Sequence, residues 1–137
     1  MNLVDKLLKS DAKKADELEK KIIKSKKLAR ILGTDEAVDI TIREIPTKRL
    51  NEIIAMQVDK KGKLDTSKMF DAKAILVAEG VIEPEVTNKD LLNHFNCPTP
   101  KDLVIKLFGN EITSISDEIA KLGGILTDED EEEEIKN

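Results

Sequence analysis

The stretch VDITIREIPTKRLNEII, residues 38–54, places a strand directly before a helix. Apolar and polar residues alternate at its start, which puts Val38, Ile40 and Ile42 on one face of a β-strand that ends by Ile45. Pro46 ends the strand, and Thr47 is placed to cap a helix. The apolar stripe of that helix consists of Leu50, Ile53 and Ile54 and runs towards Met56. The stretch therefore predicts a fold that combines strands and helices.

The residues before this stretch predict a small N-terminal lobe. An amphipathic helix is expected near the start, because its apolar residues recur at helical spacing: Leu3, Val4, Leu7 and Leu8. Residues 20–24, centred on Ile22 and Ile23, are compatible with a short strand. Ser25 is then placed to cap a helix whose apolar residues are Leu28, Ile31 and Leu32 and which Gly33 ends. Residues 1–59 are predicted to form this lobe, with a small sheet and helices.

The residues after the stretch predict mainly helices. Residues 60–65 begin with Lys-Lys-Gly-Lys and are expected to form a solvated linker. A helix apolar on nearly all sides is expected from Thr66 to Gly80, followed by a chain turn that ends at Pro84. Two further helices are expected to begin at Thr87 and Thr99, each of which can accept a hydrogen bond from a free backbone N–H group. Residues 66–125 are therefore predicted to form an all-helical lobe.

The segment TPKDLVIKLFGNEITSISDEIAKLGG, residues 99–124, predicts two helices that break at Gly109-Asn110. Each helix has an apolar face that an isolated short helix could not bury. These faces either close the core of the lobe, which is the common role of such stripes, or contact another protein, and the sequence leaves both alternatives open. The candidate partner-binding residues are Leu103, Leu107, Phe108, Ile112, Ile115 and Ile119.

The negative charge of the chain is concentrated at its C-terminal end. The formal net charge is -5, but residues 128–134 are seven consecutive acidic residues. Without residues 128–137, 22 basic residues face 21 acidic residues. Adjacent carboxylates repel one another and offer no apolar surface to bury, so residues 126–137 are predicted to be a disordered acidic tail. The predicted class is thus α+β: an N-terminal lobe, an all-helical lobe and this tail.

The residues that commonly carry chemistry do not assemble into a site. His94 and Cys97 are the only histidine and the only cysteine, whereas a structural zinc site needs four ligands. No second cysteine permits a redox pair, and the six glycines do not form a phosphate-binding loop. We therefore predict no catalytic, cofactor or metal site, and a protein that is not an enzyme. The absence of a long apolar run predicts a soluble intracellular protein without membrane contact.

Residues 13–30 are rich in lysine and favour nucleic-acid binding as an alternative function. A basic stretch of this kind can release counterions from a phosphate backbone. Acidic residues interrupt it, however, and no aromatic residue lies nearby to stack on a base. The basic residues of the stretch are Lys13, Lys14, Lys20, Lys21, Lys24, Lys26, Lys27 and Arg30. Nucleic-acid binding, as a small DNA-associated regulator, is therefore the weaker of the two functional hypotheses.

The order of elements resembles the XkdN-like tail assembly chaperones of phages and prophages. The resemblance rests on the strand at 38–45 with the helix start PTKRLNEI at 46–53, on AILVAEGVIEP at 74–84, on KDLL at 89–92, and on TPKDLV at 99–104 followed by Glu111-Ile112 and Glu118-Ile119. It covers most of residues 3–125. None of these motifs is a catalytic signature.

The resemblance implies a non-enzymatic role in phage tail assembly. It implies that the protein binds the long tape measure protein, keeps it soluble and helps to recruit tail tube subunits, in the cytoplasm of the bacterial host and without remaining in the mature virion. A tape measure protein is a long helix with apolar patches, and short amphipathic helices can cover such patches. Self-association of many weakly bound copies along one filament would strengthen binding through avidity.

Overall fold

The computed structural model describes residues 2–124, which form the predicted α+β fold. Strands β1 (Lys20–Ser25), β2 (Val38–Arg43) and β3 (Val81–Glu83) make an antiparallel sheet in that order. Ile23 of β1 lies opposite Ile40 of β2, and Ile42 lies opposite Val81 of β3. Ile40 and Ile42 are fully buried, which confirms the predicted inward face of β2.

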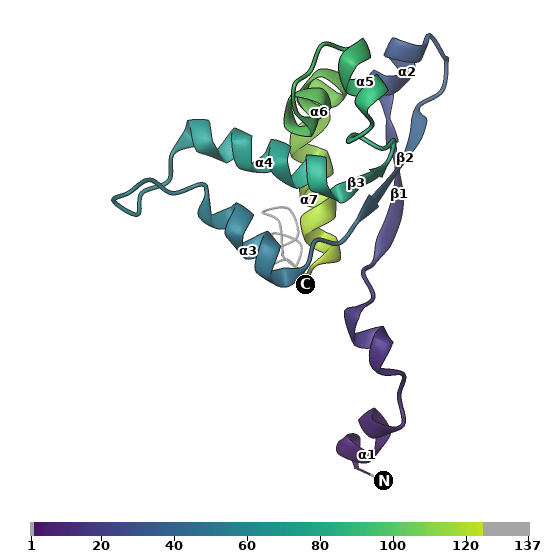
Figure 1. The fold of residues 1–137 in the computed structure, drawn as a ribbon, viewed down its shortest axis with the longest axis vertical. Coiled ribbons are helices and arrows are strands. Elements are labelled where there is room, and N and C mark those ends of the chain that lie inside the picture. The colour runs from purple at the N-terminus through teal and green to yellow at the C-terminus, as the bar shows by residue number, and fades with distance from the viewer. Residues whose placement is uncertain (1, 125–137) are drawn as a thin grey trace, which may run out of the picture.

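Four helices lie on one side of this sheet (Figure 1). They are α3 (Thr47–Ala55), α4 (Thr66–Gly80), α6 (Pro100–Phe108) and α7 (Ile112–Leu122). Helix α4 packs against both α6 and α7, and α7 also contacts β2. Ile22, which points away from the helices, is 64% exposed, so the outer face of the sheet is open to solvent. The fold therefore has two layers: a three-stranded sheet, and helices that pack on one of its faces.

One hydrophobic core extends across both predicted lobes. Ile40 and Ile53, from the first 59 residues, belong to the same buried cluster as Val77, Phe108 and Ile119 from the later helices. The segment predicted as a linker, residues 60–65, forms a turn closed by an isolated antiparallel bridge between Val58 and Leu64. The sheet and the later helices are thus stabilised by the same packing.

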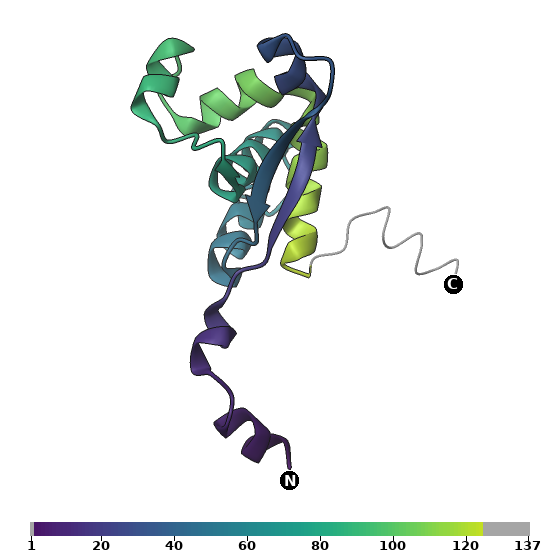
Figure 2. The same cartoon turned by 90° about the vertical axis from the view of Figure 1, so that its right-hand side faces the viewer.

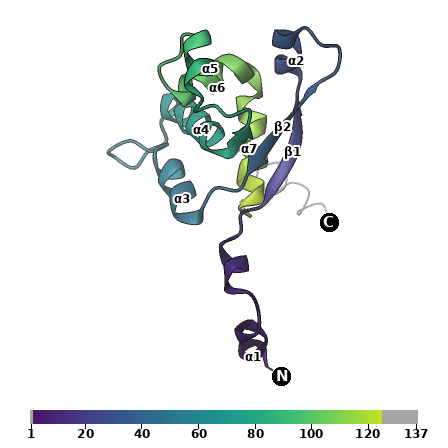
Figure 3. The ribbon, with the colours of Figure 1, turned by 45° about the vertical axis from the view of Figure 1, so that its right-hand side comes forward.

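The N-terminal residues extend away from this core. Helix α1 (Leu3–Leu8) is followed by a 3₁₀ helix, η1 (Ala12–Asp16), and neither contains a buried residue. Leu3, Val4, Leu7 and Leu8 are all more than 60% exposed. The views of Figures 2 and 3 show both elements projecting from the body of the molecule, at the end opposite α2 (Lys26–Leu32). The predicted amphipathic helix is confirmed. Its apolar face is exposed, because no other segment among residues 2–124 buries it.

Several predicted helix ends are confirmed. The Ser25 hydroxyl accepts a hydrogen bond from the Leu28 backbone N–H at 3.1 Å, and Gly33 ends α2 in the left-handed conformation with φ of 73°. Thr99 caps α6 in the same way, and Pro100 occupies the first turn, where its missing N–H has no cost. Local sequence therefore determines where these helices begin and end.

Three local predictions were wrong. Thr47 does not cap α3, because the helix begins one residue earlier: Pro46 is the N-cap, and its carbonyl accepts a hydrogen bond from Leu50 N–H. Asn88 rather than Thr87 caps α5 (Lys89–His94), since its side chain accepts from Leu91 N–H. The segment after residue 66 is not all helical: residues 81–83 form β3, which supplies backbone partners for the second edge of β2.

The predicted disordered tail, residues 126–137, lies outside the described residues. Helix α7 ends at Leu122, followed by Gly123 and Gly124, as the sequence predicts.

Candidate partner-binding surface

The six predicted partner-binding residues all lie in the core. Leu103, Leu107, Phe108, Ile112, Ile115 and Ile119 are each no more than 3% exposed. They come from α6 and α7, which pack against α4. Of the two roles that the sequence leaves open, the structure places these residues where they close the core. Contact with a partner would require the core to open, and it stays a prediction.

An apolar groove lies at the end of the molecule opposite α1, between α2, the adjoining ends of β2 and β3, and the helices α5 and α6. It encloses a cavity of about 260 Å³. Ile31 and Leu32 form its outer wall and are 42% and 64% exposed, although both lie in the apolar stripe predicted for α2. The residues that line this groove are Leu28, Ile31, Leu32, Val38, Asp39, Glu83, Pro84, Leu91, Phe95 and Leu107.

The wall of the groove is attached to the core by a part-buried polar contact. Ser25, fully buried, donates a hydrogen bond from its hydroxyl to the Glu111 carboxylate at 2.5 Å. The other oxygen of Glu111 accepts from Lys26 N–H at 3.0 Å. Glu111 ends η2 (Gly109–Glu111), the 3₁₀ turn between α6 and α7. The first turn of α2 is therefore attached to the helical side of the core, while its last turn extends to solvent.

A second, acidic hollow of about 580 Å³ adjoins the groove. The two depressions share Glu83 and Leu91. Besides these two residues, the hollow is lined by Glu85, Asn88, Asp90 and His94. The His94 ring meets the Phe95 ring edge to face, with centroids 4.9 Å apart. The apolar groove thus has carboxylates along one side.

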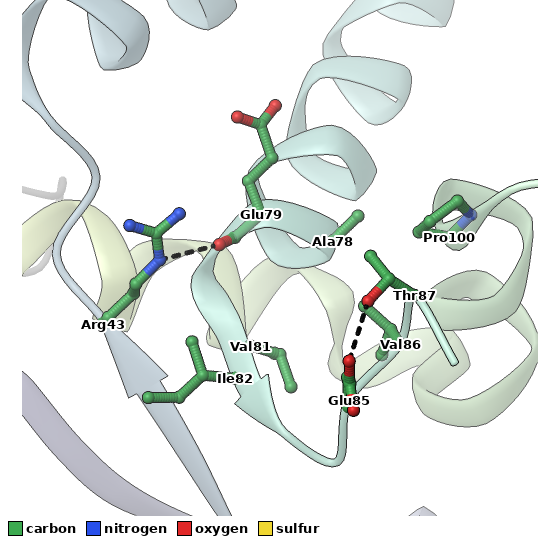
Figure 4. A pocket seen from close by; sticks show the side chains of 9 residues that line it. All are labelled: Arg43, Ala78, Glu79, Val81, Ile82, Glu85, Val86, Thr87 and Pro100. Carbon is green, nitrogen blue, oxygen red and sulfur yellow. Dashed lines mark hydrogen bonds between the residues drawn. The ribbon is translucent and has the colours of Figure 1, made fainter. Parts of the chain in front are cut away.

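Figure 4 shows another pocket, of about 460 Å³, beside β3. Its two charged groups at one end are engaged within the chain: Arg43 Nε donates to the Glu79 backbone carbonyl at 3.1 Å, and the Glu79 carboxylate pairs with Arg49. On the other side the Thr87 hydroxyl donates to Glu85 at 3.4 Å.

The Glu79 carboxylate is held by Arg49. Arg49 Nε and Nη2 donate to Glu79 at distances of 2.6 to 3.0 Å, and Nη1 donates to Glu52 at 3.2 Å. The hydrogen bonds to Glu79 and then to Glu52 raise the pKa of Arg49 above its ordinary value. These hydrogen bonds link α3 to α4, so the charges of Arg49 and Glu79 serve the packing of the two helices.

The basic residues of the alternative, nucleic-acid hypothesis do not form one free surface. Lys21 pairs with Glu118 at 2.7 Å, and Lys24 pairs with Asp39 at 2.9 Å. Lys26, Lys27 and Arg30 line a hollow that also contains Glu111. The aromatic residues Phe70, Phe95 and Phe108 all lie outside this segment.

The single cysteine, the other residue considered for chemistry, is part of the packed interior. Cys97 is buried, and its thiol donates to the Phe95 carbonyl at 3.5 Å. Among residues 2–124, His, Cys, Asp and Glu side chains do not gather in groups of three that could hold a metal ion. Across the same residues, every helix is too short or too polar to cross a membrane.

A family model for the phage XkdN-like tail assembly chaperones matches residues 4–136. The chain belongs to this family. The fold has a relative among solved structures, the crystal structure of the protein yqbn from a structural genomics programme, with a TM-score of 0.54 and 14% sequence identity over 79% of this chain and 88% of that one. This similarity shows the fold alone. No curated protein matches this tail assembly chaperone.

The sequence did not indicate the groove. Ile31 and Leu32 have the spacing of core residues. Leu91 comes from a helix with no buried residue of its own, and Phe95 is the C-cap of that helix. The one usable signal was two large apolar residues directly before Gly33 at the end of a short helix.

Proposed function

We propose that this tail assembly chaperone binds the tape measure protein of its phage, keeps it soluble and passes it to tail tube subunits. The family gives the role in tail assembly. The observation that supports the finer proposal is the apolar groove, whose wall of Ile31 and Leu32 is exposed on a protein with an otherwise closed core. Such a groove fits the apolar face of a helix.

The strength expected for one groove suits a chaperone that must release its partner. Full burial of a leucine or isoleucine side chain contributes roughly 1.5 to 3 kcal/mol. Ile31 and Leu32 are already partly buried, so each has less than this to gain. About 1.4 kcal/mol changes a dissociation constant tenfold. The few side chains of one groove therefore contribute only a few tenfold steps in affinity, and a single groove binds weakly. Tube subunits could then displace single copies.

Firm coating of a long filament would require contacts between copies. Effective concentration along one filament can raise overall affinity 10²–10⁴-fold without any stronger single contact. The exposed leucines of α1 are available for such contacts, because α1 buries no residue in the described chain. We propose self-association as part of the same function.

The proposal makes the protein a non-enzymatic helper in the cytoplasm of the bacterial host that does not remain in the mature virion. The alternative, a small DNA-associated regulator, has less support because Lys21 and Lys24 are engaged in ion pairs. Retention on DNA that falls steeply with salt would favour that alternative. No retention at low salt would dismiss it.

The test is co-expression with the long tape measure protein of the same phage. Leu32→Gln removes apolar surface from the groove, and Ile22→Gln is the matched control, since both residues are 64% exposed but Ile22 lies on the outer face of the sheet. We expect the wild type and Ile22→Gln to keep the long protein in the soluble fraction, and Leu32→Gln to lose much of this effect. If the long protein is equally soluble without the chaperone, the proposal is wrong.

A further inference from the structure

The charged side chains that line the apolar groove and the adjoining hollow are carboxylates. Asp39 and Glu83 belong to the groove lining, and Glu85 and Asp90 line the hollow that shares Glu83 and Leu91 with it. Among the residues that line either depression there is neither a lysine nor an arginine. A ligand in the groove would therefore meet apolar side chains on its inner face and carboxylates along one flank.

Two of these carboxylates are available to a ligand. Asp39 already pairs with Lys24, and Glu85 accepts from the Thr87 hydroxyl. Glu83 and Asp90 make no ion pair or side-chain hydrogen bond with any residue in the described range 2–124. Their charge is not neutralised within this part of the chain, so it can act on a partner.

We propose that the groove accepts an amphipathic helix of the tape measure protein whose apolar face is flanked by lysine or arginine on the side facing Glu83 and Asp90. This inference rests on the proposed function and specifies the chemistry of the partner. Residues three or four positions apart lie on neighbouring parts of a helix surface, so one helix can present leucines to the groove and basic groups to its acidic side. A helix with acidic flanks would place like charges together, which lowers its affinity.

The same charge argues against the chain's own acidic tail as the occupant. Residues 128–134 carry only carboxylates, which Glu83 and Asp90 would repel. The rival occupant is α1 of a second copy, since Lys6 and Lys9 accompany its exposed leucines. Helix α1 of the same chain lies at the opposite end of the molecule from α2 (Figures 1 and 3).

The test uses two synthetic helical peptides of about 18 residues, long enough to form helix on binding. Both carry the same leucine stripe, and one has lysine flanks where the other has glutamate flanks. Fluorescence anisotropy of the labelled peptides with the full chain gives both dissociation constants. At low salt we expect the lysine peptide to bind about tenfold more tightly or better. This preference should shrink as salt is added, because the charges are exposed.

A matched pair of variants locates the charges responsible. Glu83→Lys with Asp90→Lys should abolish or reverse the preference. Asp16→Lys with Glu17→Lys makes the same change in charge at exposed positions near η1 and should retain it. Equal binding of the two peptides to the wild type, or a preference that survives in Glu83→Lys/Asp90→Lys, would overturn the inference.

Further outcomes separate this inference from the proposed function and from the rival occupant. If the chain binds the lysine and glutamate peptides equally but still solubilises the long tail protein, the inference is wrong and the chaperone function stands. If the chain does not solubilise that protein, the proposed function itself fails. If a Lys6→Glu/Lys9→Glu chain binds the lysine peptide clearly more tightly than the wild type does, α1 of a second copy occupies the groove of the wild type and the inference is again wrong.

Discussion

Ser25 and Glu111, 86 positions apart in the sequence, are joined by a hydrogen bond from the Ser25 hydroxyl to the Glu111 carboxylate. Ser25 is at once the last residue of β1 and the N-cap of α2, so this bond attaches both elements to the turn between α6 and α7. The same hydroxyl accepts from Leu28 N–H. This part-buried contact thus helps to fix the position of the helix that walls the groove.

Replacing Glu111 by Ala should destabilise the protein. The change leaves the buried Ser25 hydroxyl and the Lys26 N–H without their acceptor, which costs about 1 to 3 kcal/mol in the free energy of unfolding. Urea denaturation measures this cost. Glu111→Gln keeps one acceptor oxygen and should lose less, whereas equal stability of Glu111→Ala and wild type would show that the contact contributes nothing.

Gly80→Ala should destabilise the packing of α4 on α7. A Cβ atom at residue 80 would come within 3.0 Å of Ile119 Cγ1 and still closer to its Cδ1. Ile119 is fully buried and has little room to move, so overpacking should cost about 1 to 3 kcal/mol. Thermal unfolding measures the loss. Adding Ile119→Val removes the nearest atom and should recover part of it; a Gly80→Ala protein as stable as wild type would contradict the close approach.

The elements that were predictable are those whose signals are local. Ser25, Gly33 and Thr99 act on backbone groups within a few residues of themselves, and each helix end that they mark is confirmed. Strand β3 was missed because three residues are too few to show alternation. Its place in the sheet depends on Ile42, which is distant in sequence.

The site was less predictable because burial depends on contacts between distant segments. The stripe of α2 has the spacing of a core face, but only its first turn reaches the core, so Leu28 is buried while Leu32 is exposed. For the six apolar residues of α6 and α7, the sequence shows a stripe and does not show what covers it. The bond between Ser25 and Glu111 has no sequence signal at all.

Lys21 should make a small contribution to stability through Glu118 that is lost at acid pH. The hydrogen bond and charge of Lys21 lower the pKa of Glu118 below its ordinary value. A carboxylate whose pKa is lowered by folding stabilises the protein above its ordinary pKa, and this contribution is lost as pH falls through the folded-state pKa. Lys21→Met should therefore raise the Glu118 pKa in an NMR titration. The effect on stability should stay below about 1 kcal/mol, because the pair is partly exposed and screened by solvent.

The matched control is Lys24→Met, which breaks the exposed pair with Asp39 and removes the same charge from the same strand. It should leave the Glu118 pKa close to that of the wild type. If both variants raise that pKa equally, the shift comes from the general charge of the strand and not from the direct contact with Lys21.

Deletion of residues 128–137 should reduce the solubility of the complex between the chaperone and the long tail protein. This segment holds seven of the acidic residues, and without it the chain has 22 basic and 21 acidic residues. Copies that coat one filament would then lose the net charge that keeps coated filaments apart. Light scattering of the co-expressed complex at low salt should show larger particles for the deletion. A variant with Asn and Gln in place of residues 128–134 keeps the length of the tail but not its charge, and it should aggregate like the deletion; unchanged scattering in both would reject a role for the charge.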